Sequence, residues 1–236
     1  MADRLTHYII FHKKLYPENT PDFPCFRYLA ANENVPKEID NLKIKHRIYA
    51  EYAFPGYNPI YQQLNFCDQS IYLNIPAPNT EFIGLCQYDM PINREKFKLV
   101  LDNMTGNSLI GFFLYRMSDI CSVFTIEQWQ LVLDGYNKRN NTSHKMYDFR
   151  DAPFFLMSSF VMPTWFFIKL QGELRASLPL VFKELEYNMR HISGTLERTT
   201  ALLIACALKE GKISAKVSDA LGHSRSQTLL DPRRHK

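Results

Sequence analysis

The segment EFIGLCQYDMP, Glu81 to Pro91, decides the fold of this 236-residue chain. Its apolar residues are consecutive rather than alternate, which is typical of a central strand that is covered on both faces. The run stops in Gln87, Tyr88 and Asp89, and a proline follows soon after. The sequence therefore predicts a buried strand from Glu81 to Tyr88 with a polar carboxyl end. In open α/β sheets, ligands bind beyond such ends.

The segments on both sides of this strand alternate between strand and helix patterns. Strands are predicted at residues 7–11 and 152–162 and within residues 44–50. Helices are predicted at residues 61–75, 93–104, 125–140, 164–174, around 178–188 and in 193–212, with Thr125 and Thr195 as N-caps. This alternation predicts a single α/β domain over residues 1–210, with a mostly parallel central sheet and helices on both faces. Residues 211–236 are predicted to form a basic, flexible tail with at most a marginal helix.

The charge of the chain is unevenly distributed. The formal net charge is +4, from 28 Lys and Arg and 24 Asp and Glu. Residues 209–236 contain seven Lys or Arg and three Asp or Glu, so they carry all of this charge and residues 1–208 are neutral overall. A neutral body argues against a nucleic-acid-binding domain, because basic residues would collect on one face of it. No nucleic-acid partner is therefore expected.

Cysteine usage and hydropathy point to a cytoplasmic protein. The five cysteines are scattered and form no CxxC pair, which is typical of reduced, buried thiols. No signal peptide is predicted at the N-terminus, and the stretch FFLMSSFVMPTWFFI is too short and too interrupted to span a membrane. The chain also lacks GxGxxG, Walker, GxSxG and HExxH motifs, which argues against a dinucleotide oxidoreductase or a P-loop NTPase.

Gln87 and Asp89 are the first candidates for ligand binding. Side chains two residues apart point the same way in an extended chain, so we expect both to project from the strand end while Tyr88 faces elsewhere. A carboxylate at that place can hold Mg²⁺ or Mn²⁺, which commonly takes one or two protein carboxylates and completes its shell with substrate phosphates and water. From spacing alone, a turn or cap role for Asp89 remains the alternative.

Four segments in order resemble a known enzyme family. NFCDQSIYLN, EFIGLCQYDMP, APFFLMSSFVMPTWFFIKLQGEL and RHISGTLERTTALLIACAL resemble segments of the capsular-polysaccharide glycosyltransferases of the DUF4422 type and of the short GT-A enzymes encoded by chlorella-type large DNA viruses. The family motifs correspond to His12-Lys13 and to residues 66–70, 83–89, 159–162 and 197–198. Asp68 stands where the family has glutamate, and Ser159 stands where it has asparagine. Each motif is short, so their shared order carries the resemblance.

The resemblance implies a GT-A glycosyltransferase with a nucleotide-diphosphate sugar donor, by default a UDP-sugar, and with Mn²⁺ or Mg²⁺. It implies a glycan or glycoprotein acceptor whose hydroxyl receives the sugar. The residues that it places at the donor are His12, Lys13, Asp68, Gln87 and Asp89, with His191 as a further contact. Asp89 would be the metal ligand.

The general base is left open among three carboxylates. Glu197 follows the loop RHISGT in what is predicted to be the first turn of a helix, where the helix dipole alone also favours an acid. Asp148 and Asp151 precede a predicted buried strand and are rivals that could also bind the acceptor. Two other functions remain as alternatives: a non-catalytic binding module of the same fold, and an interaction protein that acts through its basic tail.

Overall fold

The computed structural model describes residues 2–11, 15, 20–31, 47–64, 66–186 and 189–222. They form a seven-stranded sheet in the order β3-β2-β1-β4-β8-β5-β9 and a small sheet of β6 and β7. The strands are β1 Leu5–Phe11, β2 Phe26–Ala30, β3 Ile48–Ala50, β4 Phe82–Gln87, β5 Ser108–Gly111, β6 Leu114–Tyr115, β7 Phe154–Phe155, β8 Phe160–Pro163 and β9 Ser214–Val217. The α-helices are α1 Ile60–Gln63, α2 Gln69–Asn74, α3 Arg94–Asn103, α4 Met117–Ile120, α5 Ile126–Asn140, α6 Thr164–Glu184 and α7 Ile192–Lys209.

The central sheet is parallel except for β8, which runs antiparallel to both β4 and β5. β1 and β4 pair in parallel from Leu5↔Phe82 to Ile10↔Gln87. The carboxyl ends of β1 and β4 therefore lie at the same edge of the sheet as the start of β8. This topology confirms the predicted single-domain α/β fold with a mostly parallel sheet.

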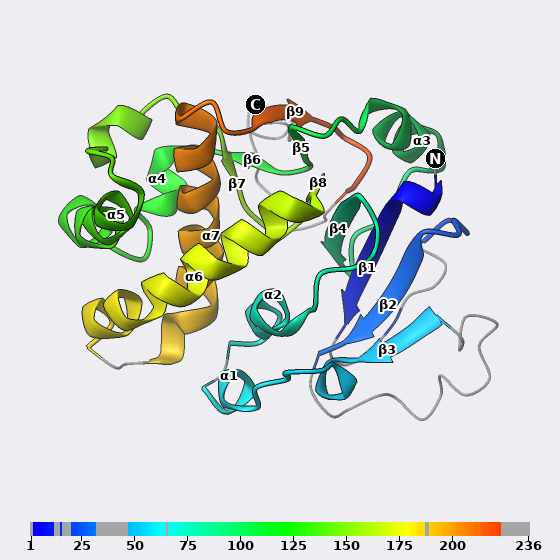
Figure 1. Cartoon of the computed structure of the whole chain (residues 1–236), viewed down its shortest axis with the longest axis horizontal. Helices are drawn as coiled ribbons and strands as arrows, with labels where there is room; N and C mark the ends of the chain where they lie inside the picture. Colours follow the sequence, from blue (N-terminus) through cyan, green and yellow to red (C-terminus); the bar gives the residue numbers. More distant parts are fainter. Residues whose placement is uncertain are drawn as a thin grey trace, which may run out of the picture.

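The two faces of the sheet carry separate hydrophobic cores. α3 packs on one face, and α2, α5, α6 and α7 contribute to the core on the other, where α6 crosses in front of α7 (Figure 1). Along β4, Phe82 and Cys86 belong to the core under α3, whereas Ile83 and Leu85 belong to the opposite core. The consecutive apolar residues of β4 follow from this double coverage.

Two helix predictions are wrong in extent. The single helix predicted at 61–75 is two short helices, α1 and α2, separated by a turn in which Cys67 has a φ of 53°. Conversely, the two helices predicted at 164–174 and 178–188 form one helix, α6, with Pro179 inside it. The proline does not end α6 because Leu174, Leu178 and Val181 around it are all buried in the core. Their burial offsets a proline penalty of about 3 kcal/mol.

One strand prediction and part of the tail prediction are also wrong. The strand predicted at 152–162 is β7 and β8, which belong to different sheets, and the break between them contains Met157 and Ser158 at positive φ. Residues 214–217, where at most a helix was expected, form β9 in parallel with β5. This strand is exposed along its length and gains its order from backbone pairing, which hydropathy does not reveal. Residues 223–236 lie outside the described residues, so a separate tail there stays a prediction.

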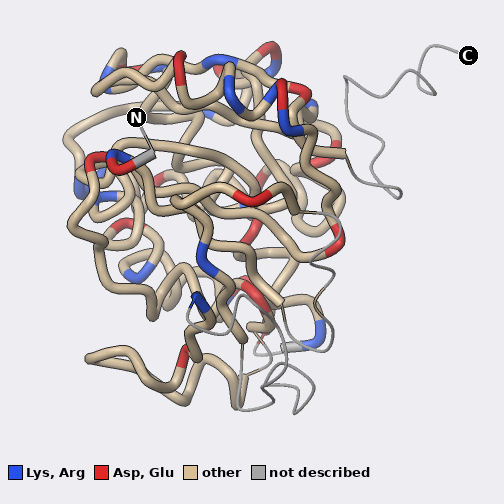
Figure 2. Tube along the Cα trace, turned by 90° about the vertical axis from the view of Figure 1, so that its right-hand side faces the viewer, with Lys and Arg blue, Asp and Glu red and all other residues tan. Residues whose placement is uncertain are grey.

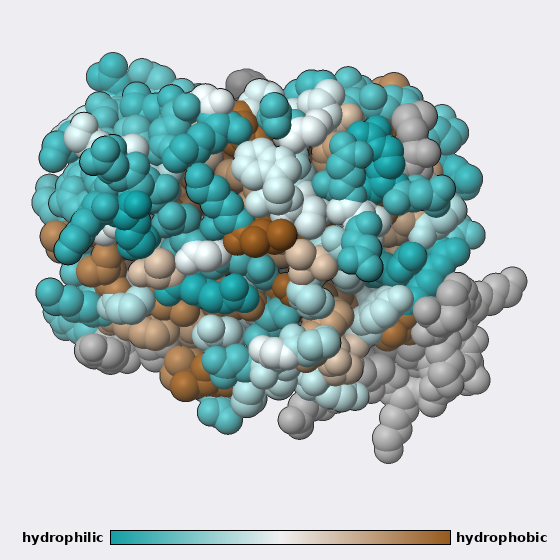
Figure 3. Space-filling model, in the orientation of Figure 1, coloured by the Kyte–Doolittle hydropathy of each residue, from teal (hydrophilic) through white to brown (hydrophobic). Residues whose placement is uncertain are grey.

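The described surface is mixed in charge and mostly hydrophilic. Lys and Arg are interspersed with Asp and Glu along the chain in Figure 2. Hydrophobic residues are scattered over the face in Figure 3 rather than gathered on it. The most exposed large hydrophobic residues, Tyr147 and Leu99, lie on separate elements. In the part of the chain that the structure describes, no helix combines the length and hydropathy that a membrane crossing requires.

Candidate active site

Polar side chains from separate segments meet beyond the carboxyl end of β4. Gln87, the last residue of β4, donates an Nε2–H to Asp68 Oδ2 at 2.9 Å. Asp68 immediately precedes α2, but its side chain forms no capping bond with that helix. Gln69 Nε2 contacts the same oxygen at 3.3 Å, and Ser193 Oγ of α7 lies 3.5 Å from Asp68 Oδ1. Three donors from separate segments therefore meet at the Asp68 carboxylate.

Glu197 lies on α7 one turn beyond Ser193, so the two side chains share a face of the helix. Its Oε1 accepts the backbone N–H of Met157, and its Oε2 lies 3.8 Å from the Arg198 guanidinium. The Glu197 side chain is only 20% exposed. Burial and the charge of Asp68 raise the pKa of Glu197 to about 7, although Arg198 and the Met157 N–H oppose the rise. Such a carboxyl group can take up and release a proton near neutral pH.

The prediction that Glu197 occupies the first turn of its helix is wrong. α7 begins at Ile192, so Glu197 lies in the second turn. The stabilising effect of a helix dipole falls off within the first turn. The dipole therefore does not account for this acid, and its raised pKa shows that its surroundings disfavour the charge.

The break between β7 and β8 holds the Glu197 carboxylate. Met157 and Ser158 have φ values of 62° and 48°, which are uncommon for residues other than glycine. The Ser158 carbonyl accepts the Tyr72 hydroxyl, and Ser158 Oγ accepts Gln69 Nε2–H at 2.6 Å. Backbone conformations of this kind persist where surrounding contacts over-determine them. Here they direct the Met157 N–H at Glu197.

The prediction that one extended strand carries both Gln87 and Asp89 is wrong. β4 ends at Gln87, and Tyr88 and Asp89 form a turn in which Met90 N–H donates to the Gln87 carbonyl at 3.2 Å. Gln87 reaches Asp68 on the α2 side. Burial and the charge of Asp89 raise the pKa of the Cys86 thiol, which belongs to the core on the opposite face. The extended geometry fails because the strand ends at its first polar residue. The role of Asp89 as a metal ligand stays a prediction.

The rival carboxylates Asp148 and Asp151 have surface roles. Asp148 Oδ2 accepts the Lys145 N–H at 2.8 Å and so caps its own short 3₁₀ helix, Met146–Phe149. The Asp151 side chain is 87% exposed and lies 3.4 Å from the Arg150 side chain. These contacts place neither carboxylate among the side chains around Asp68.

Three predicted donor contacts stay predictions. His12 and Lys13 lie outside the described residues; β1 ends before them at Phe11, at the sheet edge where Gln87 lies. His191 is exposed and directly precedes α7, where its carbonyl accepts the Thr195 hydroxyl at 2.9 Å. The side chain of His191 is therefore near the start of the helix that carries Ser193 and Glu197, without a contact that defines its role.

A buried network outside the sequence predictions supports α2. Glu51 follows β3 and is fully buried. Its carboxylate accepts Gln62 Nε2–H at 2.6 Å and Asn74 Nδ2–H at 2.7 Å. Gln62 also contacts Ser70 Oγ at 2.5 Å. These contacts connect α1 and the segment after β3 to both ends of α2, which begins next to Asp68.

The described side chains offer no preformed metal cage. Among them, no group of three His, Cys, Asp or Glu could hold a metal ion. This does not fit a structural site in which the protein supplies most ligands. It is compatible with Mg²⁺ or Mn²⁺ held by one carboxylate, with substrate phosphates and water completing the shell.

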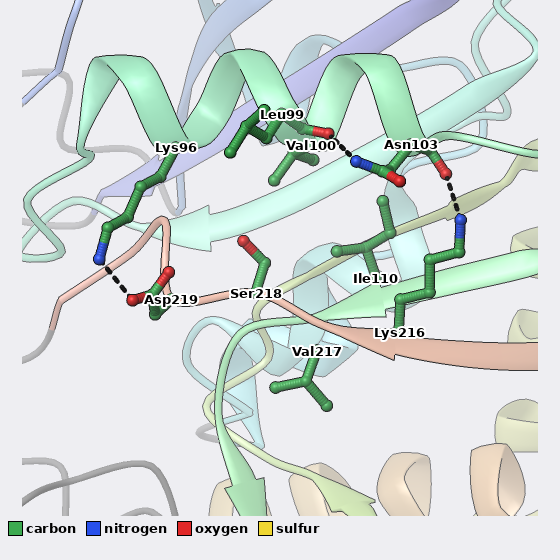
Figure 4. Close-up of a pocket in the computed structure, with 9 residues that line it drawn as sticks. All are labelled: Lys96, Leu99, Val100, Asn103, Ile110, Lys216, Val217, Ser218 and Asp219. Atoms are coloured by element: carbon green, nitrogen blue, oxygen red, sulfur yellow. Dashed lines mark hydrogen bonds and ion pairs between the residues drawn. The ribbon is translucent and has the colours of Figure 1, made fainter.

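A pocket of about 280 Å³ lies elsewhere, between α3 and β9 (Figure 4). At one end Lys96 forms an ion pair with Asp219, and at the other Lys216 Nζ donates to the Asn103 carbonyl at 3.2 Å. Leu99 and neighbouring apolar side chains contribute to its lining. None of the residues around Asp68 line this pocket, so it is separate from the candidate site.

Comparisons with known proteins match the fold and not the sequence. No family model and no curated protein matches the chain, so the resemblance to DUF4422-type and viral enzymes stays a prediction. The apo structure of the bifunctional glycosyltransferase WbbM is similar with a TM-score of 0.62 at 12% identity, over 97% of this chain and 47% of that one. This chain thus spans about half the length of the WbbM chain. The apo structure of mouse xyloside xylosyltransferase 1 gives a TM-score of 0.44 at 10% identity, over 90% of this chain and 84% of that one. The likeness to WbbM confirms the predicted GT-A-like fold.

Proposed function

We propose that this chain is a glycosyltransferase, which moves a sugar from a nucleotide-diphosphate sugar, by default a UDP-sugar, to a hydroxyl of a glycan or glycoprotein. The observation that carries the proposal is the Glu197 carboxyl, which is mostly buried beside Asp68 and has a pKa of about 7. It lies at the sheet edge where open α/β folds bind ligands. The fold shared with WbbM supports the enzyme class.

Glu197 acts as the general base in this proposal. The acceptor oxygen forms a bond to the anomeric carbon while the bond from that carbon to the diphosphate oxygen breaks. The electron pair of the broken bond leaves with the nucleoside diphosphate, and the hydroxyl proton passes to Glu197. A base with a pKa near the working pH suits this transfer, and positioned bases typically contribute about 10²- to 10⁴-fold in rate. The Met157 N–H fixes one carboxylate oxygen throughout.

Asp68, Gln87 and Ser193 bind hydroxyl groups of the donor. An ionised carboxylate, an amide and a hydroxyl together offer both acceptors and donors, which suits a sugar or ribose ring that carries neighbouring hydroxyls. Gln87 and Ser193 contact opposite oxygens of Asp68, so the three side chains present one polar surface. His12, Lys13 and His191 are proposed to contact the diphosphate.

Asp89 would hold Mn²⁺ or Mg²⁺ in this proposal, because it is the carboxylate in the turn directly after β4. A bound divalent cation would offset the negative charge of the diphosphate. The protein contributes a single carboxylate, so the affinity for the metal depends on the donor. Free metal alone is therefore expected to bind weakly.

A panel of nucleotide sugars tests the proposal, with thermal shift and sugar release or transfer measured with and without Mn²⁺. A ligand that binds only the native state raises its stability. Glu197→Gln is expected to keep the thermal shift and lose about 10²-fold or more in turnover. Asp102→Asn, an exposed carboxylate on α3, is the control and retains turnover. If Asp148→Asn or Asp151→Asn abolishes turnover instead, the base is misassigned. If no nucleotide sugar binds, the function is wrong, and binding without turnover indicates a non-catalytic module.

A further inference from the structure

Asp68 and Glu197 belong to one closed ring of contacts between α2 and α7. On one side, Ser193 Oγ lies 3.5 Å from Asp68 Oδ1, and Glu197 follows one turn later on the same face of α7. On the other side, Gln69 Nε2 contacts both Asp68 Oδ2, at 3.3 Å, and Ser158 Oγ, at 2.6 Å. The residue before Ser158 donates its N–H to Glu197. The two carboxylates are therefore held on facing surfaces.

The position of Asp68 is fixed by its partners and not by its own helix. The backbone of Asp68 is helical, and its carboxylate does not cap α2. Gln87 holds Oδ2 from the end of a central strand at 2.9 Å. Gln69 is 1% exposed and cannot swing away without leaving the core. A carboxylate locked in this way keeps a constant distance from the face of α7.

The other groups described around Glu197 do not provide a negative charge in place of Asp68. From α2, burial keeps the pKa of the Tyr72 phenol well above its ordinary value, and the charges of Asp68 and Glu197 add to this effect. From the segment between β7 and β8, the neighbour is an uncharged N–H. From α7 itself, Arg198 is drawn aside, because its guanidinium also donates to the carbonyls of Asp119 at 3.0 Å and Gly194 at 2.9 Å. Within the described part of the chain, Asp68 supplies the negative charge that acts on Glu197.

We propose that Asp68 is a positioning residue that acts through Glu197: its locked carboxylate moves the range over which Glu197 takes up and releases its proton to higher pH than burial alone would. A fixed like charge disfavours the ionised form of a neighbouring carboxyl group. Without the Asp68 charge, Glu197 ionises at lower pH and becomes a weaker base. The kinetic consequence rests on the proposed function, whereas the titration of Glu197 does not.

The titration is tested by ¹³C NMR of the glutamate side-chain carboxyl groups in the full chain, with the Glu197 signal assigned by its absence in Glu197→Gln. In Asp68→Asn, the titration midpoint of Glu197 is expected to fall by about one pH unit. Asp68→Glu keeps the charge and is expected to keep the midpoint near that of the wild type. Asp102→Asn removes an exposed charge on α3 and leaves the midpoint unchanged.

A second variant keeps the test decisive if Asp68→Asn fails to fold. Gln87→Met removes the 2.9 Å donor that locks Asp68 and preserves most of the side-chain volume. The released carboxylate moves away from its like charge, so the Glu197 midpoint is again expected to fall, by less than in Asp68→Asn. An unchanged midpoint in a folded variant of either kind overturns the proposal.

The pH profile of sugar transfer separates this inference from the proposed function. The acidic limb of kcat/KM is expected to move to lower pH in Asp68→Asn by the same amount as the NMR midpoint. A shifted midpoint without any transferase activity in the wild type supports the coupling and refutes the function. Transferase activity with an unshifted midpoint supports the function and refutes the coupling.

Discussion

Glu197→Gln should stabilise the protein at alkaline pH, although it removes the proposed catalytic base. Burial and the charge of Asp68 raise the pKa of Glu197 from its ordinary value of 4.5 to about 7. Between these values the native state holds a proton that the unfolded chain has released. The stability of the wild type therefore falls as the pH rises through this window. Glutamine has nearly the same shape and never ionises, so the variant does not lose this stability.

The size of the effect follows from the two pKa values. The rise from 4.5 to about 7, at about 1.4 kcal/mol for each pH unit, bounds the stabilisation of the variant above pH 7 at about 3.5 kcal/mol. The side chain is 20% exposed, and the variant loses its attraction to Arg198 at 3.8 Å. Glutamine Oε1 still accepts the Met157 N–H, so the hydrogen bond is preserved. We expect a net gain of about 1–3 kcal/mol at pH 8 and none from this source below pH 4.5.

Urea unfolding of both proteins between pH 4 and pH 8.5 measures this difference, with the fluorescence of the fully buried Trp129 as the probe. Other titrating groups are common to both proteins and cancel when the two are compared at the same pH. Asp102→Asn is the control for loss of an exposed carboxylate and should show no such pH dependence. A difference between Glu197→Gln and wild type that does not change with pH would refute the reasoning, as would a loss of stability that grows toward pH 8.

Four further outcomes are expected. Burial lowers the pKa of His7 to about 3, so wild-type stability should fall as the pH drops from 6.5 toward 3, by at most about 5 kcal/mol, and His7→Gln should remove this slope in urea titrations. Gly84→Ala should cost about 1–3 kcal/mol in the same assay, because a Cβ would lie 2.0 Å from the His7 ring. Ser158→Val should lower Tm more than Ser158→Gly, because the φ of 48° is unfavourable for a β-branched residue; equal losses would contradict this. Asp89→Asn should reduce the Mn²⁺ stimulation of sugar transfer while donor binding without metal persists, and full stimulation in the variant would exclude it as a ligand.

The parts of the fold that the sequence predicted are those that local chemistry specifies. β4 has consecutive apolar residues because it is covered on both faces, and α5 begins at Ile126, directly after Thr125, whose hydroxyl caps the helix as expected. β9 was not predicted, because its residues are exposed and its order comes from pairing with β5. Pro179 suggested a helix boundary, but the burial of its neighbours overrides that signal. The pattern of residue types along the sequence does not reveal these tertiary contributions.

In the candidate site, too, the sequence indicated features that depend on local motifs and missed features that depend on tertiary contacts. Asp68, Gln87 and Glu197 were found from the order of short motifs, and the structure relates them to one another. Their partners were missed, because the contacts that hold them join residues far apart in the sequence. Gln69 and Ser158 are 89 residues apart, and Asp68 and Ser193 are 125 apart. An amide directly beside Asp68 in a helix of buried residues is a signal that could have pointed to Gln69.

The turn after β4 decides how the two predicted ligands of this strand can act. Alternation along a strand places Gln87 on the same side as Ile83 and Leu85, where α2 and α7 carry Asp68 and Glu197. Because the strand ends at Gln87, alternation gives no information about Asp89, whose charge instead acts on Cys86 in the opposite core. The strand thus positions Gln87, which contacts Asp68, whereas the turn after the strand positions the proposed metal ligand.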